Sequence, residues 1–125
     1  MIIGSGIDLV QIDRIQNIIT KWNLHFLNKV YTSNEIIYCE HKNNYRFQSY
    51  AGYFAAKEAL TKAIGTGMQS IKWKEIEIRK DALGKPFIYL SGQAKTIAVK
   101  RMISNINLSI SHTGKLAIAQ VIIEG

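Results

Sequence analysis

Two carboxylates and a lysine lie among apolar residues, where a charged side chain needs a partner of opposite charge. Asp8 follows an apolar stretch, and Glu58 and Lys62 lie within an alanine-rich segment, residues 54–62. Because residues four apart share one face of a helix, Glu58 and Lys62 form either a surface ion pair or two halves of a site. In such a site Glu58 would hold a cation and Lys62 an anion. Mg²⁺ favours one or two carboxylates with phosphate oxygens, so Asp8 is either a second metal ligand or an N-cap of the following helix.

Other chemical signals are weaker. Gly65-Thr66-Gly67 matches no P-loop, because the helix precedes the glycines and no Lys-Ser/Thr follows, so it is best explained as a helix cap. Ser109, Ser111 and His112 alternate on a strand edge and can donate to phosphate or orient a water. No Gly-x-Ser-x-Gly elbow supports a serine hydrolase, and one cysteine with three scattered histidines argues against zinc.

These residues must be positioned by alternating short strands and helices. We expect a buried strand over residues 2–10 and an amphipathic helix over 11–20 that exposes Asp13, Arg14 and Lys21. Thr32 and Glu35 form a capping box for a further helix, and the longest helix covers residues 45–64. Strands near 76–79 and 87–90 flank a turn, Ser91 caps a helix over 93–103, and strands 107–111 and 116–123 end the chain. This order predicts an α+β fold, an antiparallel sheet packed on a long central helix.

Length and composition indicate one ordinary globular domain over residues 1–125. The chain has 47% hydrophobic and 20% charged residues, which excludes disordered and collagen-like proteins. No apolar run approaches the roughly 18 residues of a membrane span, and the first residues do not resemble a signal peptide. Cys39 has no disulfide partner, so we expect a cytoplasmic protein that is not bound to membranes. The net charge of +7 favours polyanionic or phosphorylated partners.

Three segments in order resemble a known family. The segments are Gly6-Ile7-Asp8-Leu9-Val10, then Ala51-Gly52-Tyr53-Phe54-Ala55-Ala56-Lys57-Glu58-Ala59 continuing to Gly67, then Leu108-Ser109-Ile110-Ser111-His112-Thr113. Together they are similar to the small bacterial 4′-phosphopantetheinyl transferases of the holo-[acyl-carrier-protein] synthase type. The Gly84-Lys85-Pro86 turn also fits, and the resemblance spans nearly the whole chain.

The resemblance implies a magnesium-dependent enzyme of fatty acid synthesis. Its members move the phosphopantetheine arm of coenzyme A onto a serine of apo acyl carrier protein and release adenosine 3′,5′-bisphosphate. It implies that Asp8 and Glu58 bind Mg²⁺ at the coenzyme pyrophosphate, and that Lys62 contacts the phosphates. By the same analogy Gly65 lets the chain pass close to the nucleotide. A second set of residues would line the coenzyme site, from a neighbouring subunit of a homotrimer: Lys85, Pro86, Ser111, His112 and Thr113.

The resemblance also implies a docking surface and one departure. Acyl carrier protein would dock on the first helix at Arg14, with Lys21 as a second contact. Tyr53 stands where the family has an arginine that helps hold the coenzyme phosphates, and Arg46, two helical turns earlier, is our candidate replacement. The base that takes the serine proton is either Glu58 or a water that Glu58 or the metal orients.

Two other functions remain open at this point. The charge of +7 and the aromatic residues also suit a nucleic-acid-binding module, although no RRM, KH or helix-turn-helix signature is present and we expect no nucleic-acid partner. The substitution at Tyr53 is compatible with a relative that binds coenzyme A or carrier protein without turnover.

Overall fold

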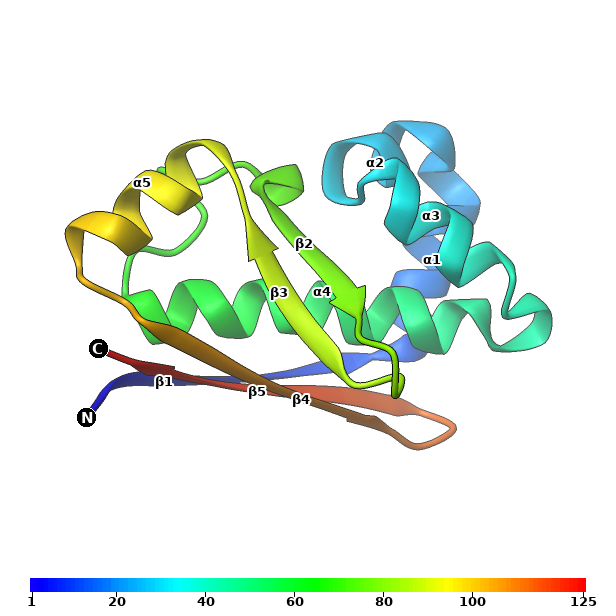
Figure 1. The fold of residues 1–125 in the computed structure, drawn as a ribbon. Helices are drawn as coiled ribbons and strands as arrows, with labels where there is room; N and C mark the ends of the chain where they lie inside the picture. Colours follow the sequence, from blue (N-terminus) through cyan, green and yellow to red (C-terminus); the bar gives the residue numbers. More distant parts are fainter.

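A three-stranded antiparallel sheet lies against one long helix (Figure 1). The computed structural model describes residues 1–125. In the sheet, β5 (Leu116–Glu124) lies between β1 (Ile2–Gln11) and β4 (Asn105–His112). Helix α4 (Arg46–Ile64) covers one face of this sheet. The α+β prediction, with an antiparallel sheet on a long central helix, is confirmed.

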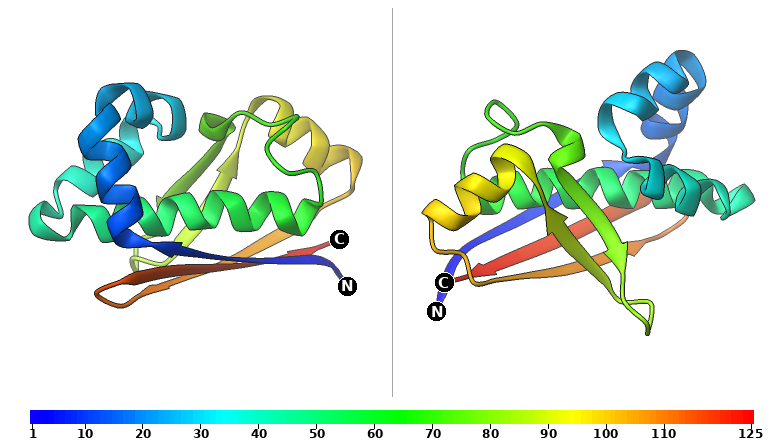
Figure 2. Two further views of the ribbon diagram at one scale, coloured as in Figure 1. Left: turned by 180° about the vertical axis from the view of Figure 1, so that it is seen from behind. Right: turned by 45° about the horizontal axis from the view of Figure 1, so that its top comes forward.

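Two further groups of elements flank the ends of α4 (Figures 1 and 2). Near its N-terminal end lie three helices, α1 (Ile12–Trp22), α2 (Leu24–Val30) and α3 (Ser33–Glu40). The hairpin of β2 (Ile76–Lys80) and β3 (Pro86–Leu90) packs against α4 and β4, and α5 (Gly92–Lys100) follows it. Two short 3₁₀ turns complete the chain: η1 (Asn43–Tyr45) before α4 and η2 (Trp73–Glu75) before β2. None of the helices combines the length and the apolar character needed to cross a bilayer.

Helix α4 is buried on most of its circumference, and small side chains allow the neighbouring elements to pack closely around it. Ala51, Ala55, Ala56 and Ala59 are fully buried. The helix ends at Gly65, which has φ 90° and donates its N–H to the Thr61 carbonyl at 2.8 Å. This left-handed C-cap confirms the prediction made for the glycine pair.

Strand β1 approaches α4 so closely that side chains on its inner face are excluded. A Cβ on Gly6 would overlap the Ala59 carbonyl oxygen and lie 2.7 Å from the Ala63 nitrogen, and one on Gly4 would overlap the Ala63 carbonyl oxygen. Since side chains alternate along a strand, Asp8 points to the same face as Gly6. The glycines therefore bring the backbone of β1 near α4 just before Asp8.

Most predicted elements exist, with shifted ends. The capping box is confirmed, since Thr32 Oγ1 accepts from the Glu35 N–H at 3.3 Å and Glu35 Oε1 from the Thr32 N–H at 2.8 Å. Helix α2 carried no sequence signal, because it is only seven residues long and Asn23 with φ 44° breaks it from α1. Ser91 occupies the predicted N-cap position of α5, but its side chain does not cap the helix. Glu75 Oε2 instead accepts from the Gln93 N–H at 2.9 Å.

Helix α5 also ends earlier than expected. Its last residue is Lys100, three residues before the predicted end, because the chain turns at Met102 with φ 56°. The hydrogen bonds of the turn satisfy the last carbonyls of the helix, and Arg101 donates to the carbonyl of Ile64 at the end of α4. The helix therefore ends at Lys100, where Arg101 contacts α4, although the sequence pattern alone predicted further helical residues.

Candidate active site

Asp8, Glu58 and Lys62 meet in one hollow of about 700 Å³ between β1, α1 and α4. We call it the first hollow. Arg14 lies on its wall, together with apolar side chains that include Phe54 and Ile18. The three charged residues that the sequence singled out for chemistry are therefore brought together from positions 8 to 62 of the chain.

Strand β1 and helix α4 divide the charged side chains of the first hollow between them. Asp8 is not a helix cap, because α1 begins four residues later with Gln11 at its N-cap position. Its carboxylate instead accepts a hydrogen bond from Lys62 Nζ at 2.9 Å, and the same Nζ donates to the Ile7 carbonyl at 3.1 Å. The surface ion pair between Glu58 and Lys62, one of the two alternatives that the spacing left open, does not form, because Lys62 pairs with Asp8.

Glu58 is the carboxylate without a partner in the first hollow. Its side chain is half-buried and makes no hydrogen bond or ion pair. Burial raises the pKa of Glu58, the negative charge of Asp8 raises it further, and the charge of Lys62 lowers it. Two neighbouring carboxylates with too little positive charge form a donor set that suits a cation. Mg²⁺ commonly binds to only one or two carboxylates and completes its shell with phosphate oxygens and water, so Asp8 and Glu58 fit this ion. No cluster of three or more ligating side chains is present.

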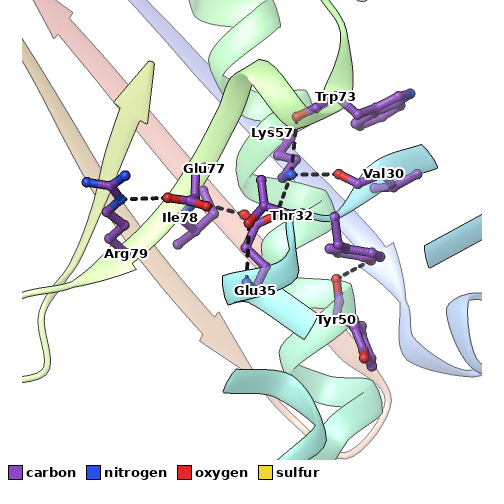
Figure 3. Close-up of polar contacts among 10 residues, drawn as sticks. Val30, Thr32, Glu35, Tyr50, Lys57, Trp73, Glu77, Ile78 and Arg79 are labelled. Atoms are coloured by element: carbon purple, nitrogen blue, oxygen red, sulfur yellow. Dashed lines mark hydrogen bonds and ion pairs between the residues drawn. The ribbon is translucent and has the colours of Figure 1, made fainter. Parts of the chain in front are cut away.

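A buried ion pair next to Glu58 fixes α4 to its surroundings (Figure 3). Lys57 is fully buried, and its Nζ donates to Glu35 Oε1 and to the Val30 carbonyl, each at 2.7 Å, and to the Trp73 carbonyl at 3.2 Å. Glu35 Oε2 accepts from the Ile78 N–H at 2.8 Å. Every buried side-chain polar atom thus has a partner. The network joins α2, α3, η2 and β2 to the helix that carries Glu58.

Sequence reasoning missed this network. It treated Glu35 only as the partner of Thr32 in the capping box and gave Lys57 no role. One feature of the sequence indicated that Lys57 is buried: it directly follows Phe54-Ala55-Ala56, an apolar run without a polar residue beside it. Such a residue needs a buried anion, but no spacing rule identifies Glu35, 22 residues earlier.

The other predicted coenzyme residues lie away from the first hollow. Pro86 and His112 line a second hollow of about 510 Å³, next to Tyr53. Lys85 is exposed in the adjoining turn, and its N–H donates to Asp81 Oδ1 at 2.9 Å. Gly65 is exposed at the end of α4 and borders neither hollow.

Ser111 and Thr113 are exposed near the turn between β4 and β5. Thr113 Oγ1 accepts from the N–H groups of Lys115 and Leu116, both at 3.1 Å, so its hydroxyl stabilises this turn. Within one chain, the two predicted groups of coenzyme residues are thus on separate surfaces.

Tyr53 and Arg46 also have defined surroundings. Tyr53 is 3% exposed and stacks on Tyr38 with ring centroids 5.6 Å apart. Arg46, the candidate replacement for the missing arginine, lies outside the second hollow. Its guanidinium is 4.0 Å from the Glu40 carboxylate and donates to the Asn43 carbonyl at 3.2 Å. On α1, Lys21 is exposed near the C-terminal end, about two helical turns beyond Arg14.

Known proteins resemble this chain over its full length. Residues 4–120 match the family model described as the 4′-phosphopantetheinyl transferase superfamily. Holo-[acyl-carrier-protein] synthase of Halothermothrix orenii is 48% identical over 98% of this chain and 97% of its own length. That of Alkaliphilus oremlandii is 50% identical over 98% of both chains.

Solved structures show the same fold. The crystal structure of the Neisseria meningitidis synthase has a TM-score of 0.91 at 32% identity and covers 100% of both chains. The Helicobacter pylori synthase in complex with coenzyme A has a TM-score of 0.85 at 34% identity, and covers 96% of this chain and 99% of that one. The fold, the first hollow and the full-length matches agree, and the chain belongs to the 4′-phosphopantetheinyl transferase superfamily.

Proposed function

We propose that this protein is a holo-[acyl-carrier-protein] synthase that transfers 4′-phosphopantetheine from coenzyme A to a serine of apo acyl carrier protein. The observation that carries the proposal is the meeting of Asp8, Glu58 and Lys62 in the first hollow. The relatives named above are holo-[acyl-carrier-protein] synthases, and two of the similar solved structures hold coenzyme A or a part of it.

The reaction exchanges a phosphoanhydride bond of the coenzyme pyrophosphate for a phosphodiester bond to the serine. The serine hydroxyl oxygen attacks the phosphorus that carries the pantetheine arm, and the bond from that phosphorus to the bridging oxygen breaks. The leaving group is adenosine 3′,5′-bisphosphate, which keeps the bridging oxygen, and the hydroxyl proton passes to a base. Such a transfer depends on positioning and on stabilising charge at the phosphoryl oxygens.

The residues of the first hollow divide these tasks. Asp8 and Glu58 would hold Mg²⁺, which when bound supplies positive charge at the pyrophosphate. Lys62 Nζ, on a side chain that is 53% exposed, can leave Asp8 and donate to a phosphate oxygen. Glu58 would accept the serine proton directly or through a water that it orients.

The chain's own geometry supports a site shared between copies. Phe54 and Glu58 border the first hollow, whereas Gly52 and Tyr53 border the second, so the two hollows lie on different faces of α4. One coenzyme molecule that contacts Asp8, Glu58 and Lys62 of one copy would meet Pro86 and His112 of another. In this arrangement Lys85, Ser111 and Thr113 border the coenzyme from the second copy, and Gly65 lies beside the nucleotide.

The outer face of the sheet suits such an assembly. Ile3, Ile7 and Leu9 of β1 and Leu116 of β5 are 36–60% exposed on the face opposite α4. An apolar sheet face of this kind is typical of a subunit interface. We propose a homotrimer. Light scattering on the wild type and on Ile7→Lys tests it, with a trimer mass for the wild type and a smaller species for the variant.

The decisive experiment is intact-mass spectrometry of apo acyl carrier protein incubated with coenzyme A, Mg²⁺ and this protein. The expected result is a mass gain of one phosphopantetheine group that a chelator abolishes. Retained coenzyme A binding with no mass gain would instead identify a binding protein without turnover. Salt-sensitive binding to short RNA or DNA, with no binding of coenzyme A, would favour a nucleic-acid-binding module.

A further inference from the structure

Helix α4 places three side chains in a row along the first hollow. Phe54, Glu58 and Lys62 follow one another at intervals of four residues, and all three border it. Lys62 and its partner Asp8 make one end of this row charged, whereas Phe54 makes the other end apolar. The hollow therefore offers different surfaces to its ligands on the two sides of Glu58.

Trp73 packs on Phe54 but does not itself border the first hollow. The two rings stack with their centroids 4.9 Å apart and an interplanar angle of 22°. Phe26 of α2 also packs on Phe54, with a centroid distance of 6.4 Å and a tilt of 31°. These two neighbours restrict the orientations that the Phe54 ring can take in the wall of the hollow.

The main chain of Trp73 is fixed to the same helix (Figure 3). The Trp73 carbonyl accepts a hydrogen bond from Lys57 Nζ at 3.2 Å, so η2 contacts α4 at residues 54 and 57. This hydrogen bond uses a backbone atom and does not depend on the side chain at position 73. A substitution of Trp73 therefore removes the stacked ring and keeps the acceptor for Lys57.

The indole of Trp73 also borders a third hollow, of about 500 Å³, which lies between α2 and residues 68–74. Part of the indole is thus open to this hollow, while Phe54 stacks on one of its faces. Truncation of the ring would enlarge an open hollow rather than leave a closed cavity, so the fold should tolerate it. The role of the ring can therefore be measured separately from folding.

The apolar end of the first hollow suits the acceptor rather than the coenzyme. The pyrophosphate needs the charged end, and in an in-line transfer the serine approaches the phosphorus from the side opposite the leaving nucleotide. We propose that Trp73 is a positioning residue, which fixes Phe54 as an apolar contact for acyl carrier protein beside the acceptor serine. This inference rests on the proposed function. It adds to the exposed charges of α1 a determinant from η2, an element that does not border the first hollow.

A double-mutant cycle tests whether Trp73 acts through Phe54. Steady-state transfer is measured for the wild type, Trp73→Ala, Phe54→Ala and the double variant. Trp73→Ala should raise the KM for acyl carrier protein by about tenfold and leave the KM for coenzyme A unchanged. Because the indole acts only through Phe54, the double variant should be no worse than Phe54→Ala.

Two further variants separate positioning from damage. Trp73→Phe keeps a ring for the stack and should restore most of the wild-type KM for the carrier protein. Tyr89→Ala is the matched control and should keep both KM values. Tyr89 is a half-exposed aromatic residue of β3 that packs on Arg79, and it borders neither the first nor the third hollow. Thermal unfolding of every variant measures the folded fraction.

Several results of the cycle would overturn the inference. If the effects of the two substitutions multiply, Trp73 does not act through Phe54. An unchanged KM for the carrier protein in Trp73→Ala would also overturn it, as would a raised KM for coenzyme A in the same variant. A KM for the carrier protein that stays high in Trp73→Phe would show that the stack is not what matters.

Failure of the proposed function is distinguishable from failure of this inference. If the wild type transfers nothing, the proposed function fails, and fluorescence anisotropy of labelled apo acyl carrier protein still measures its affinity for each variant. Trp73→Ala should then bind the carrier protein more weakly, and Trp73→Phe as tightly as the wild type. Equal affinities for all variants, or no binding by the wild type, would overturn the inference as well.

Discussion

Lys62 Nζ and Asp8 Oδ1 lie 2.9 Å apart, and this ion pair joins β1 to α4 across 54 residues of sequence. Because Asp8 holds the lysine, Glu58 is left without a partner in the same hollow. The lysine side chain is 53% exposed, so little rearrangement is needed for it to turn to a phosphate. The arrangement therefore keeps one carboxylate and one ammonium group available for a ligand.

Glu58→Gln should abolish most of the transfer activity while leaving the fold intact. The amide has the same shape but no charge for a cation and no basicity toward the serine proton. Loss of several kcal/mol of transition-state stabilisation corresponds to a rate lower by on the order of a thousandfold. Intact-mass kinetics measure the rate, and thermal unfolding of the same sample controls for folding. Near-normal rates in this variant would refute the role assigned to Glu58.

The charges around Glu58 predict its titration in the metal-free protein. Burial and the charge of Asp8 hold the pKa of Glu58 above the ordinary value of 4.5. Asp8→Asn should lower this pKa, since a like charge is removed, and Lys62→Met should raise it, since an opposite charge is removed. Carbon-13 NMR of the glutamate carboxyl groups measures all three values. Shifts of opposite sign would show that the side chains do not share one hollow.

Activity should reflect the same pKa. As pH falls through the raised pKa of Glu58, the carboxylate gains a proton and loses its affinity for a cation. The acid limb of the rate profile is therefore expected above the ordinary glutamate range in limiting Mg²⁺. Saturating Mg²⁺ should move the limb to lower pH, because the bound cation favours the charged form.

Lys57→Met should destabilise the fold strongly. The substitution removes the only cation that pairs with Glu35, a carboxylate that is 1% exposed. Breaking a buried pair in this way costs about 3–5 kcal/mol. Lys62→Met is the matched control, because it breaks an ion pair whose lysine is 53% exposed, for which a cost of about 0–1 kcal/mol is expected. Urea denaturation measures both free energies of unfolding, and equal losses would contradict the role given to the Lys57 network.

Burial also predicts a rescue for Lys57→Met. Burial raises the pKa of Glu35, and the charge of Lys57 opposes this rise. Without Lys57 the neutral acid is favoured, so Glu35→Gln, which keeps an acceptor for the Ile78 N–H, should recover part of the lost stability. A double variant that is no more stable than Lys57→Met would argue against an unpaired charge as the cause.

Gly6→Ala should separate β1 from α4. The added Cβ would overlap the Ala59 carbonyl oxygen and lie 3.0 Å from its carbon, and these atoms belong to a helix backbone that cannot turn aside. We expect a loss of about 1–3 kcal/mol or more of stability, with a further loss of activity because Asp8 is displaced. Gly114→Ala is the control, because its Cβ would meet nothing within 4 Å. Similar stability of the two variants would show that the close approach is not needed.

Arg14 and Lys21 should affect the carrier protein rather than the coenzyme. Both are exposed on α1, and Arg14 also borders the first hollow, where the carrier serine must enter. Arg14→Ala should raise the KM for acyl carrier protein by about tenfold, and Lys21→Ala by less, because isolated surface charges contribute little. The KM for coenzyme A should stay the same. An equal rise for both substrates would place Arg14 in the coenzyme site.

Much of this protein followed from local patterns in the sequence. The capping box at Thr32 and Glu35 and the left-handed cap at Gly65 are short-range features whose partners lie within a few residues. The alternation of a strand can also be seen along one segment, even where its paired strand is distant, as β5 is from β1. The motif residues Asp8, Glu58 and Lys62 were found in the same way, because their types and contexts are unusual along the chain itself.

Only the tertiary structure decided how distant charges are paired. The sequence allowed Glu58 to pair with Lys62, but the close packing of Gly6 on Ala59 brings Asp8 to the lysine instead. It gave Lys57 no role, although a buried ammonium group must find an anion, and Glu35 supplies it from 22 positions away. Spacing rules describe neighbours along one helix or strand. Which distant charges form pairs depends on how closely the backbones of two elements approach each other. The size of the side chains at the contact between the elements sets this distance between backbones.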